Sequence, residues 1–379
     1  MLVLKNPLTQ PDSLYFPLPL ALLNGKLVLL RQCPEFEADL IGKEVTAING
    51  VPSSQIVASL LQYAAADGGG TRFAEGLVQL NLPVLITQYF ASPPAYEVGA
   101  AGRTLQVQAI RTVRAEVPRY PLGWRALRAT MTRGPNALHL GPPDSAAILV
   151  VSTFSRADKA FFRRAFGRIE DAKPSGLILD LRGNTGGSRT AAVALTKRLV
   201  NAAFGYSLIR PKGQNLRPFL NRKGKTYLTL GSLKYGLGAA FRSRHTPLGK
   251  EYRYRYMPAK NPFNRPVAVL TNGLTFSAST MVTSWLKQYS KAVFVGQQAA
   301  GGYNGNNGGV FPRLTLPYSG MVIQIPAYRL VLDAASAQRT GIVPDVPVPL
   351  TTSDLLSGRD AELEAAKQVL GHRAKEQAE

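Results

Sequence analysis

Two short segments contain residue types that could carry out acyl-transfer chemistry. The first is the glycine-rich stretch DLRGNTGG, Asp180 to Gly187, between a predicted buried strand and a predicted helix. Glycines let the backbone approach a ligand closely and direct N–H groups at a phosphate or a developing oxyanion. The segment has neither the Gly-Lys-Ser/Thr ending of a Walker phosphate loop nor the glycine spacing of a dinucleotide fingerprint. A tight turn without function is the alternative.

The second segment is VLTNGLTFSASTM, Val269 to Met281, in which Ser277 precedes apolar residues with helical spacing. At a helix N-terminus the free N–H groups and the helix dipole would stabilise an alkoxide or a neighbouring oxyanion by about 0.3 to 2 kcal/mol. Serine is also a favoured N-cap, and in isolation Ser277 is better explained by capping. The segment is not the Gly-x-Ser-x-Gly elbow of α/β-hydrolases.

Alternating strand and helix patterns surround both segments. Buried-type strands are predicted at 147–152, 176–181, 267–271 and 292–295, and helices at 158–170, 190–200 and from residue 277. Such alternation predicts an α/β core with largely parallel strands. The alternating segment 321–332 predicts a further strand, and an amphipathic helix is expected after Gly358. The core is assigned to 146–370 and a charged tail to 371–379.

Residues 1–112 have the pattern of a small α+β unit. Strands are predicted at 26–30, 44–49 and 104–110, and a helix begins after the capping residues Ser53 and Ser54. The order of strand, turn, strand ending in INGVP and then helix resembles a PDZ-like module. Five prolines interrupt the following residues, so 113–145 is predicted to be a connector with one strand.

The composition is that of an ordinary globular chain with a large positive charge. The 379 residues carry a formal charge of +22, which favours anionic partners without naming one. Cys33 is the only cysteine, so an intrachain disulfide framework and a thiolate-only metal site are excluded. No apolar run reaches the roughly 18 residues of a membrane span. No cofactor or metal motif is found.

Much of the positive charge falls in a stretch interpreted as a basic, aromatic insertion, 205–264, which includes YRYRY at 252–256. Basic side chains with interleaved aromatics could bind nucleic acid or a membrane surface. A solvated insertion or a lid beside the catalytic cleft are the alternatives. Nucleic acid is the less favoured partner.

The two segments, together with GQQAAGGYNGNNGG and GIVPDVPV further along, resemble the tail-specific, or carboxy-terminal processing, family of serine peptidases, which includes the tricorn protease. The resemblance implies an α/β fold, a crotonase/Clp-like spiral of β-β-α units preceded by the PDZ-like module. It implies that Ser277 is the nucleophile and that the N–H of Ala278 joins that of Gly186 or Gly187 as the oxyanion hole. It also implies peptide or protein substrates and an extracytoplasmic location.

The general base is not identified by this resemblance. Where the processing proteases have a lysine, the aligned residue is Gly302, and Lys287 and Lys291 are better explained as solvated charges. Where the tricorn branch has a glutamate, this chain has Gln338, and Asp333 is the nearest carboxylate that could replace it. That branch's histidine lies before the PDZ-like module, whereas the three histidines here lie after it: His139, His245 and His372.

Two hypotheses follow from the missing base. A histidine-bearing segment and a secretion signal would precede Met1, so that the chain as given has a truncated start. Alternatively, the protein keeps the fold as a binding protein without catalysis. The leading interpretation is a serine endopeptidase that acts through Ser277.

Overall fold

The computed structural model describes residues 14–30, 38–64, 70–111, 131–213, 215–238 and 243–376. Cys33, most of the predicted connector and the last residues of the charged tail lie outside these ranges.

The N-terminal residues form an antiparallel sheet covered by two helices. The strands are β1 (Leu20–Leu23), β2 (Lys26–Leu29), β3 (Glu44–Ile48), β4 (Val51–Pro52), β5 (Ala95–Ala100) and β6 (Arg103–Gln108), in the order β1-β2-β3-β5-β6 with β4 paired to β3. The helices are α1 (Ser53–Tyr63) and α2 (Arg72–Tyr89), and a short 3-10 helix, η1, spans Ala38–Leu40. The unit has its own buried core, which includes Leu27, Val45, Ile56 and Tyr96. The predicted strands β2, β3 and β6 and the helix α1 are confirmed, whereas β1, β5 and α2 were not predicted.

A seven-stranded sheet forms the centre of the larger unit. Its order is β20 (Val346–Pro347), β15 (Val293–Gly296), β14 (Val267–Thr271), β10 (Leu177–Asp180), β9 (Ala147–Val150), β8 (Asn136–His139) and β7 (Met131–Arg133). The strands from β20 to β9 are parallel, and β8 and β7 are antiparallel additions. The predicted α/β core with largely parallel strands is therefore confirmed.

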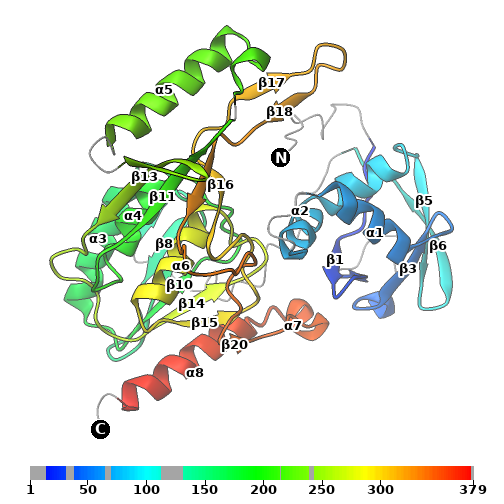
Figure 1. Cartoon of the computed structure of the whole chain (residues 1–379). Coiled ribbons are helices and arrows are strands. Elements are labelled where there is room, and N and C mark those ends of the chain that lie inside the picture. Colours follow the sequence, from blue (N-terminus) through cyan, green and yellow to red (C-terminus); the bar gives the residue numbers. More distant parts are fainter. Residues whose placement is uncertain are drawn as a thin grey trace.

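Helices cover both faces of this sheet (Figure 1). On one face lie α3 (Asp158–Ala172), α4 (Arg189–Thr196) and α6 (Ala278–Tyr289). On the other lies α8 (Ala361–Glu376), preceded by the short α7 (Thr352–Ser357). Leu149 faces the first layer, and its neighbour Ile148 packs with Leu370 of α8 in the second. Burial on both faces explains why the central strands are continuously apolar.

A second, antiparallel sheet lies against α6 and contains much of the predicted insertion. Its order is β12 (Ser243–Thr246), β13 (Gly249–Tyr256), β11 (Phe204–Pro211), β19 (Tyr328–Val331) and β16 (Gly305–Gly308). The YRYRY segment is β13, and its Tyr254 ring stacks on Tyr206 with the ring centroids 4.7 Å apart. Trp285 of α6 donates a hydrogen bond to the Gly205 carbonyl over 2.7 Å. The strands β11 and β13 of the predicted insertion are thus paired with each other in a sheet that packs on α6.

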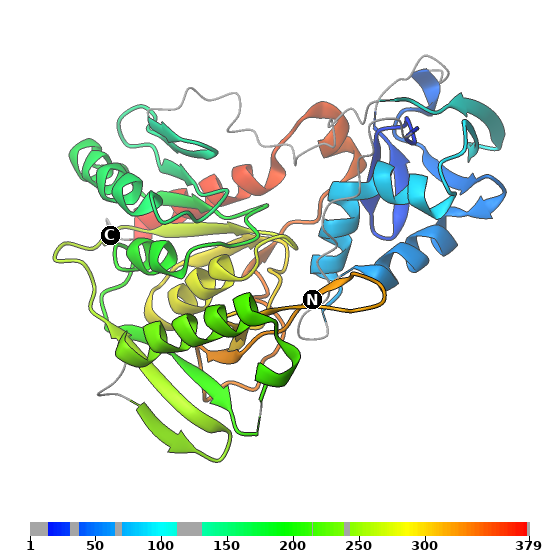
Figure 2. The same cartoon turned by 90° about the horizontal axis from the view of Figure 1, so that it is seen from above.

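Two further elements project from this second sheet. One is α5 (Arg222–Gly238), preceded by the 3-10 helix η3 (Arg217–Phe219), and the other is the hairpin of β17 (Arg313–Thr315) and β18 (Val322–Gln324). Figure 2 shows the molecule from above, with the N-terminal unit to one side of the larger unit. No helix in the described ranges is both long and apolar enough to cross a bilayer.

Candidate active site

Ser277 lies between β14 and α6 in a strained backbone conformation. Its φ is 55° and its ψ is −111°, a region that residues other than glycine rarely adopt. Its side chain makes no capping hydrogen bond to the helix, which removes the capping explanation that the sequence favoured. The hydroxyl has no hydrogen-bond partner among the described residues, and Ser277 is partly exposed although the residues after it are buried. A strained backbone that presents a partly exposed hydroxyl without a hydrogen-bond partner is typical of a nucleophile at a strand-to-helix turn.

The glycine-rich turn after β10 lies directly against Ser277. A Cβ at Gly186 would be 2.7 Å from the Ser277 Cβ and 2.8 Å from the Ala278 nitrogen. A Cβ at Gly187 would be 2.1 Å from the Phe154 carbonyl oxygen. Both positions require glycine because no side chain fits there. The structure thus brings together the two segments that the sequence singled out.

Two buried asparagines hold these segments together. Asn184 accepts through its backbone carbonyl from Phe276 N–H over 3.0 Å and from Ser279 Oγ over 2.9 Å. Asn272 accepts through its side chain from Gly183 N–H over 3.1 Å. Sequence reasoning did not select either residue. The available signal was an asparagine shortly after each of two buried strands, at the carboxyl edge where parallel strands place functional loops.

The turn leaves two backbone donors free beside Ser277. The Gly186 N–H is already donated to the Asn184 side-chain oxygen over 2.8 Å. Among the described residues, the N–H groups of Gly187 and Ala278 have no acceptor. Of the two predicted glycine donors, Gly187 is therefore the one available for an oxyanion, together with Ala278.

The predicted acid Asp333 lies in a turn just after β19. Its carboxylate accepts from Ala335 N–H over 2.9 Å and is hydrogen-bonded to the Tyr303 hydroxyl. Burial, together with the charge of Asp333, raises the pKa of that hydroxyl. Within the described ranges no hydrogen bond joins Asp333 to Ser277. Gln338, which the resemblance predicts at the position of the tricorn glutamate, donates to the Gly341 carbonyl over 3.0 Å.

No lysine or histidine in the described ranges forms a hydrogen bond with Ser277. Lys287 pairs with Asp345 over 2.6 Å, in agreement with its interpretation as a surface charge. His245 and His372 are exposed on β12 and α8. A Cβ at Gly302 would be 2.5 Å from the Gly305 carbonyl oxygen, so this backbone has no space for a lysine there.

A buried ionic cluster anchors the start of the glycine turn. Arg182 pairs with Asp180 on β10 and with Asp360 and Glu362 at the start of α8, each at 2.7 Å. All four side chains are almost completely buried. Burial raises the pKa of Glu362 to about 7, although the charge of Arg182 opposes this shift. The cluster ties the C-terminal helix to the turn that carries Gly186 and Gly187.

Helix α2 of the N-terminal unit packs on the residues just before Ser277. The Phe73 ring stacks on Phe276 with centroids 4.0 Å apart and planes 19° apart. A Cβ at Gly76 would be 2.7 Å from the Leu274 side chain. Figure 1 shows α2 on the side of its unit that faces α6. The N-terminal unit therefore contacts the turn that sets the Ser277 geometry.

The described residues contain no group of three or more His, Cys, Asp or Glu side chains arranged to hold a metal ion. The chemistry that this site can perform with its own groups is attack by a hydroxyl and stabilisation of an oxyanion.

Comparison with known proteins identifies a family. The model of peptidase family S41 matches residues 145–348, which include Ser277, Ala278 and the whole glycine turn. No curated protein matches the chain.

Among solved structures, mature CPAF has a TM-score of 0.64 at 14% identity, covering 96% of this chain and 83% of its own. Mature CPAF complexed with lactacystin gives 0.64 at 15%, covering 96% and 84%. A photosystem II C-terminal processing protease gives 0.40 at 17%, covering 96% and 78%. At these identities the CPAF structures establish a shared fold, which is mixed α/β in this chain.

Proposed function

This chain belongs to peptidase family S41, and from that premise we propose that it cleaves peptide or protein substrates by acyl transfer through Ser277. The observation that carries the proposal is the strained, uncommitted Ser277 beside the glycine turn. A helix-capping serine would instead donate or accept within its own first turn.

In the proposed reaction the Ser277 Oγ attacks the scissile carbonyl carbon while a base takes its proton. The carbonyl oxygen becomes an oxyanion and accepts hydrogen bonds from the N–H groups of Ala278 and Gly187. Such donors contribute roughly 3 to 4 kcal/mol each to transition-state stabilisation. Collapse of the tetrahedral intermediate breaks the C–N bond, and the amine leaves after it takes the proton from the base. Water then hydrolyses the acyl-enzyme.

We further propose that the protein represents a branch without the catalytic lysine. The packing around Gly302 supports this, because a lysine there would displace backbone. The hypothesis of a histidine base encoded in front of Met1 stays a prediction, and reading the upstream frame tests it. Asp333 also stays a predicted acid, although its contacts are those of a turn-forming residue.

The N-terminal unit is proposed to be a PDZ-like module that binds an extended peptide by strand addition to its sheet. The core is proposed to follow the spiral of β-β-α units of the crotonase type, and the protein is proposed to act outside the cytoplasm. Fractionation of the native host with an antibody to the protein tests that location.

A fluorophosphonate probe tests the catalytic proposal directly. The full chain should be labelled, with the modified peptide containing Ser277, and the Ser277→Ala variant should not be labelled. Ser290→Ala is a matched control, because Ser290 lies at the other end of α6; this variant should label like the parent.

One observation favours a second function, a ligand-binding member of the fold without catalysis. It is the lack of any base hydrogen-bonded to Ser277 among the described residues. A protein that unfolds cooperatively, and so is folded, yet never reacts with the probe would support this second function and contradict the first.

A further inference from the structure

Almost all of the net charge of the chain lies in one continuous stretch. Residues 181–332 contain 22 Lys and Arg and a single acidic residue, Glu251, so 22 less one gives +21 of the total +22. Glu251 is itself neutralised locally by Arg244 and Arg253. Arg182 is buried against Asp180, Asp360 and Glu362 and adds nothing to the surface. Many of the other cations of this stretch lie on the second sheet and on α5, where Glu251 is the one acidic residue.

Helix α5 exposes both apolar and cationic side chains. Tyr227, Leu230 and Leu233 are 51%, 60% and 55% exposed. They lie three residues apart, so they follow one side of the helix. Three exposed cations lie in the first turn of the helix: Arg222, Lys223 and Lys225. The opposite side packs inward through Leu228.

Other exposed apolar side chains lie next to α5. Phe219, in η3 just before α5, is exposed, and the Tyr318 side chain at the tip of the β17–β18 hairpin is fully exposed. The hairpin base and α5 are in contact, because Gly231 approaches Val310 so closely that a Cβ would be 2.6 Å from it. Figure 1 shows α5 and the hairpin projecting from the same end of the molecule.

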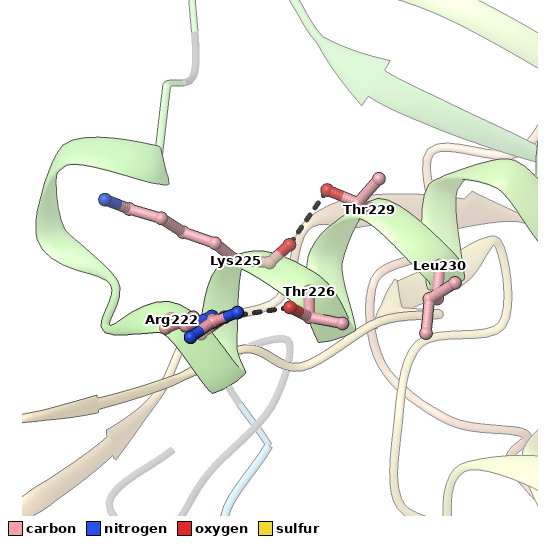
Figure 3. A pocket seen from close by; sticks show the side chains of 5 residues that line it. All are labelled: Arg222, Lys225, Thr226, Thr229 and Leu230. Atoms are coloured by element: carbon pink, nitrogen blue, oxygen red, sulfur yellow. Dashed lines mark hydrogen bonds between the residues drawn. The ribbon is translucent and has the colours of Figure 1, made fainter.

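A hollow of about 420 Å³ lies on this helix (Figure 3). It is lined by Arg222, Lys225, Thr226, Thr229 and Leu230. Arg217 adds a third positive group at its edge, since its guanidinium donates to Thr229 Oγ1 over 3.0 Å. Guanidinium and ammonium groups around a shallow hollow suit a phosphate group, and Leu230 gives the same hollow an apolar wall.

We propose that α5 and the β17–β18 hairpin form a surface that adsorbs to bilayers rich in anionic phospholipid, independently of peptidase activity. Aliphatic and aromatic side chains would enter the headgroup boundary, while Lys and Arg extend to the lipid phosphates. The positive charge favours an anionic bilayer over a second copy of the chain as the partner of this surface, because two such surfaces would repel each other. In this binding mode the protein lies on the surface of the membrane, and no membrane-spanning helix is required.

Flotation of the full chain with vesicles tests the proposal. We expect binding to vesicles with about one third phosphatidylglycerol and none to pure phosphatidylcholine at about 0.1 M salt. The triple variant Arg222→Gln, Lys223→Gln, Lys225→Gln should bind roughly a hundredfold more weakly, at about fivefold per charge. Leu230→Ser with Leu233→Ser should also weaken binding, and this loss should persist at low salt.

Matched control variants distinguish binding through the α5 surface from binding through the overall positive charge of the protein. Lys159→Gln, Arg163→Gln, Arg164→Gln removes the same charge from α3, which lies outside the cationic stretch, and Leu80→Ser removes an exposed leucine from α2. Both should bind like the parent. All substituted side chains are exposed or partly exposed, and unchanged thermal unfolding confirms folding.

Three results would overturn the proposal. They are equal binding to neutral vesicles, equal weakening by the α3 control, and absence of vesicle binding by a chain that binds polyglutamate through α5. The last result would assign the surface to an acidic protein.

Discussion

Gly186 is the residue of the glycine turn whose side-chain position lies directly against Ser277. A methyl group there would overlap the Ser277 Cβ, the Ala278 nitrogen and the Phe276 carbonyl, all within 2.9 Å, and φ is +107°. We predict that Gly186→Ala abolishes fluorophosphonate labelling of Ser277 and lowers the free energy of unfolding by about 1 to 3 kcal/mol. Labelling kinetics and denaturant unfolding measure the two effects.

Gly167→Ala is the control for that substitution. Gly167 lies within α3, and a Cβ there meets no atom within 4 Å. Alanine should stabilise the helix by about 0.5 to 1 kcal/mol and leave labelling unchanged. Normal labelling of Gly186→Ala would mean that the glycine turn does not shape the nucleophile site.

Glu362 makes the stability of the fold depend on pH near neutrality. Its pKa is raised from 4.5 to about 7 by burial, so between these values the folded state binds more protons than the unfolded state. The free energy of unfolding should therefore fall as the pH rises through this window, by up to about 3 kcal/mol. The cost arises chiefly because the ionised Glu362 carboxylate is buried away from water, and the negative charges of Asp360 and Asp180 add a smaller contribution.

We predict that Glu362→Gln flattens this dependence while keeping a hydrogen bond to Arg182. Denaturant unfolding across the window, on the parent and the variant, measures the difference in slope. Glu364→Gln is the control, because Glu364 is exposed on the same helix. Parallel slopes for the parent and Glu362→Gln would refute the assignment of the titration to Glu362.

At the scale of elements, α2 connects the N-terminal unit to the nucleophile turn. The Phe73 ring covers Phe276, the residue before Ser277, and Leu274 fills the space that Gly76 leaves. We predict that Phe73→Ala slows probe labelling of Ser277 by roughly tenfold, since a stacked aromatic pair contributes about 1 kcal/mol beyond its burial. The rate constant of labelling at several probe concentrations separates reactivity from probe affinity.

Leu80→Ala is the matched control on α2, because Leu80 is an exposed residue of that helix. Its labelling rate should equal that of the parent. If Phe73→Ala also reacts at the parental rate, the stacking of Phe73 on Phe276 only holds the N-terminal unit against the core and does not position Ser277.

The sequence predicted the elements that repeat a simple pattern and missed those whose packing is irregular. The strands on either side of Ser277 were predictable because burial on both faces makes them continuously apolar. Helix α2 was missed because Pro83 and Gly76 interrupt it. Pro83 has no N–H to donate to the Gln79 carbonyl four residues earlier, so the sequence pattern at this point favours a helix break, although α2 continues through it.

The site was predicted at the residues whose type alone signals chemistry. Ser277 and the glycine turn were found, but the choice between Gly186 and Gly187 needed the Asn184 hydrogen bond. The strand β11 was interpreted as part of an insertion because its partner β19 lies about 120 residues further along the chain (Ile209 pairs with Arg329), a distance over which local patterns carry no pairing information.

At the scale of the whole molecule, the charge divides the chain into a near-neutral part and a strongly cationic part. The cationic residues 181–332 include Ser277 and both oxyanion donors. A field of one sign over a binding cleft raises the encounter rate with ligands of the opposite sign, and salt screens it. Acidic peptides should therefore be captured better than basic ones.

We predict that the Ser277→Ala protein, which should bind without turnover, binds a glutamate-flanked peptide on the order of tenfold more tightly than its glutamine-substituted counterpart at low salt. The preference should disappear between about 0.02 M and about 0.2 M salt, because the Debye length falls from about 20 Å to less than 8 Å over that range. Fluorescence anisotropy with both peptides measures it, and the α5 charge variant described above serves as a control. If that variant loses the preference while the α3 variant keeps it, peptide is captured at α5. If both variants keep it, the positive field around Ser277 is sufficient. A salt-independent preference would show that charge is not what the protein uses to capture peptides.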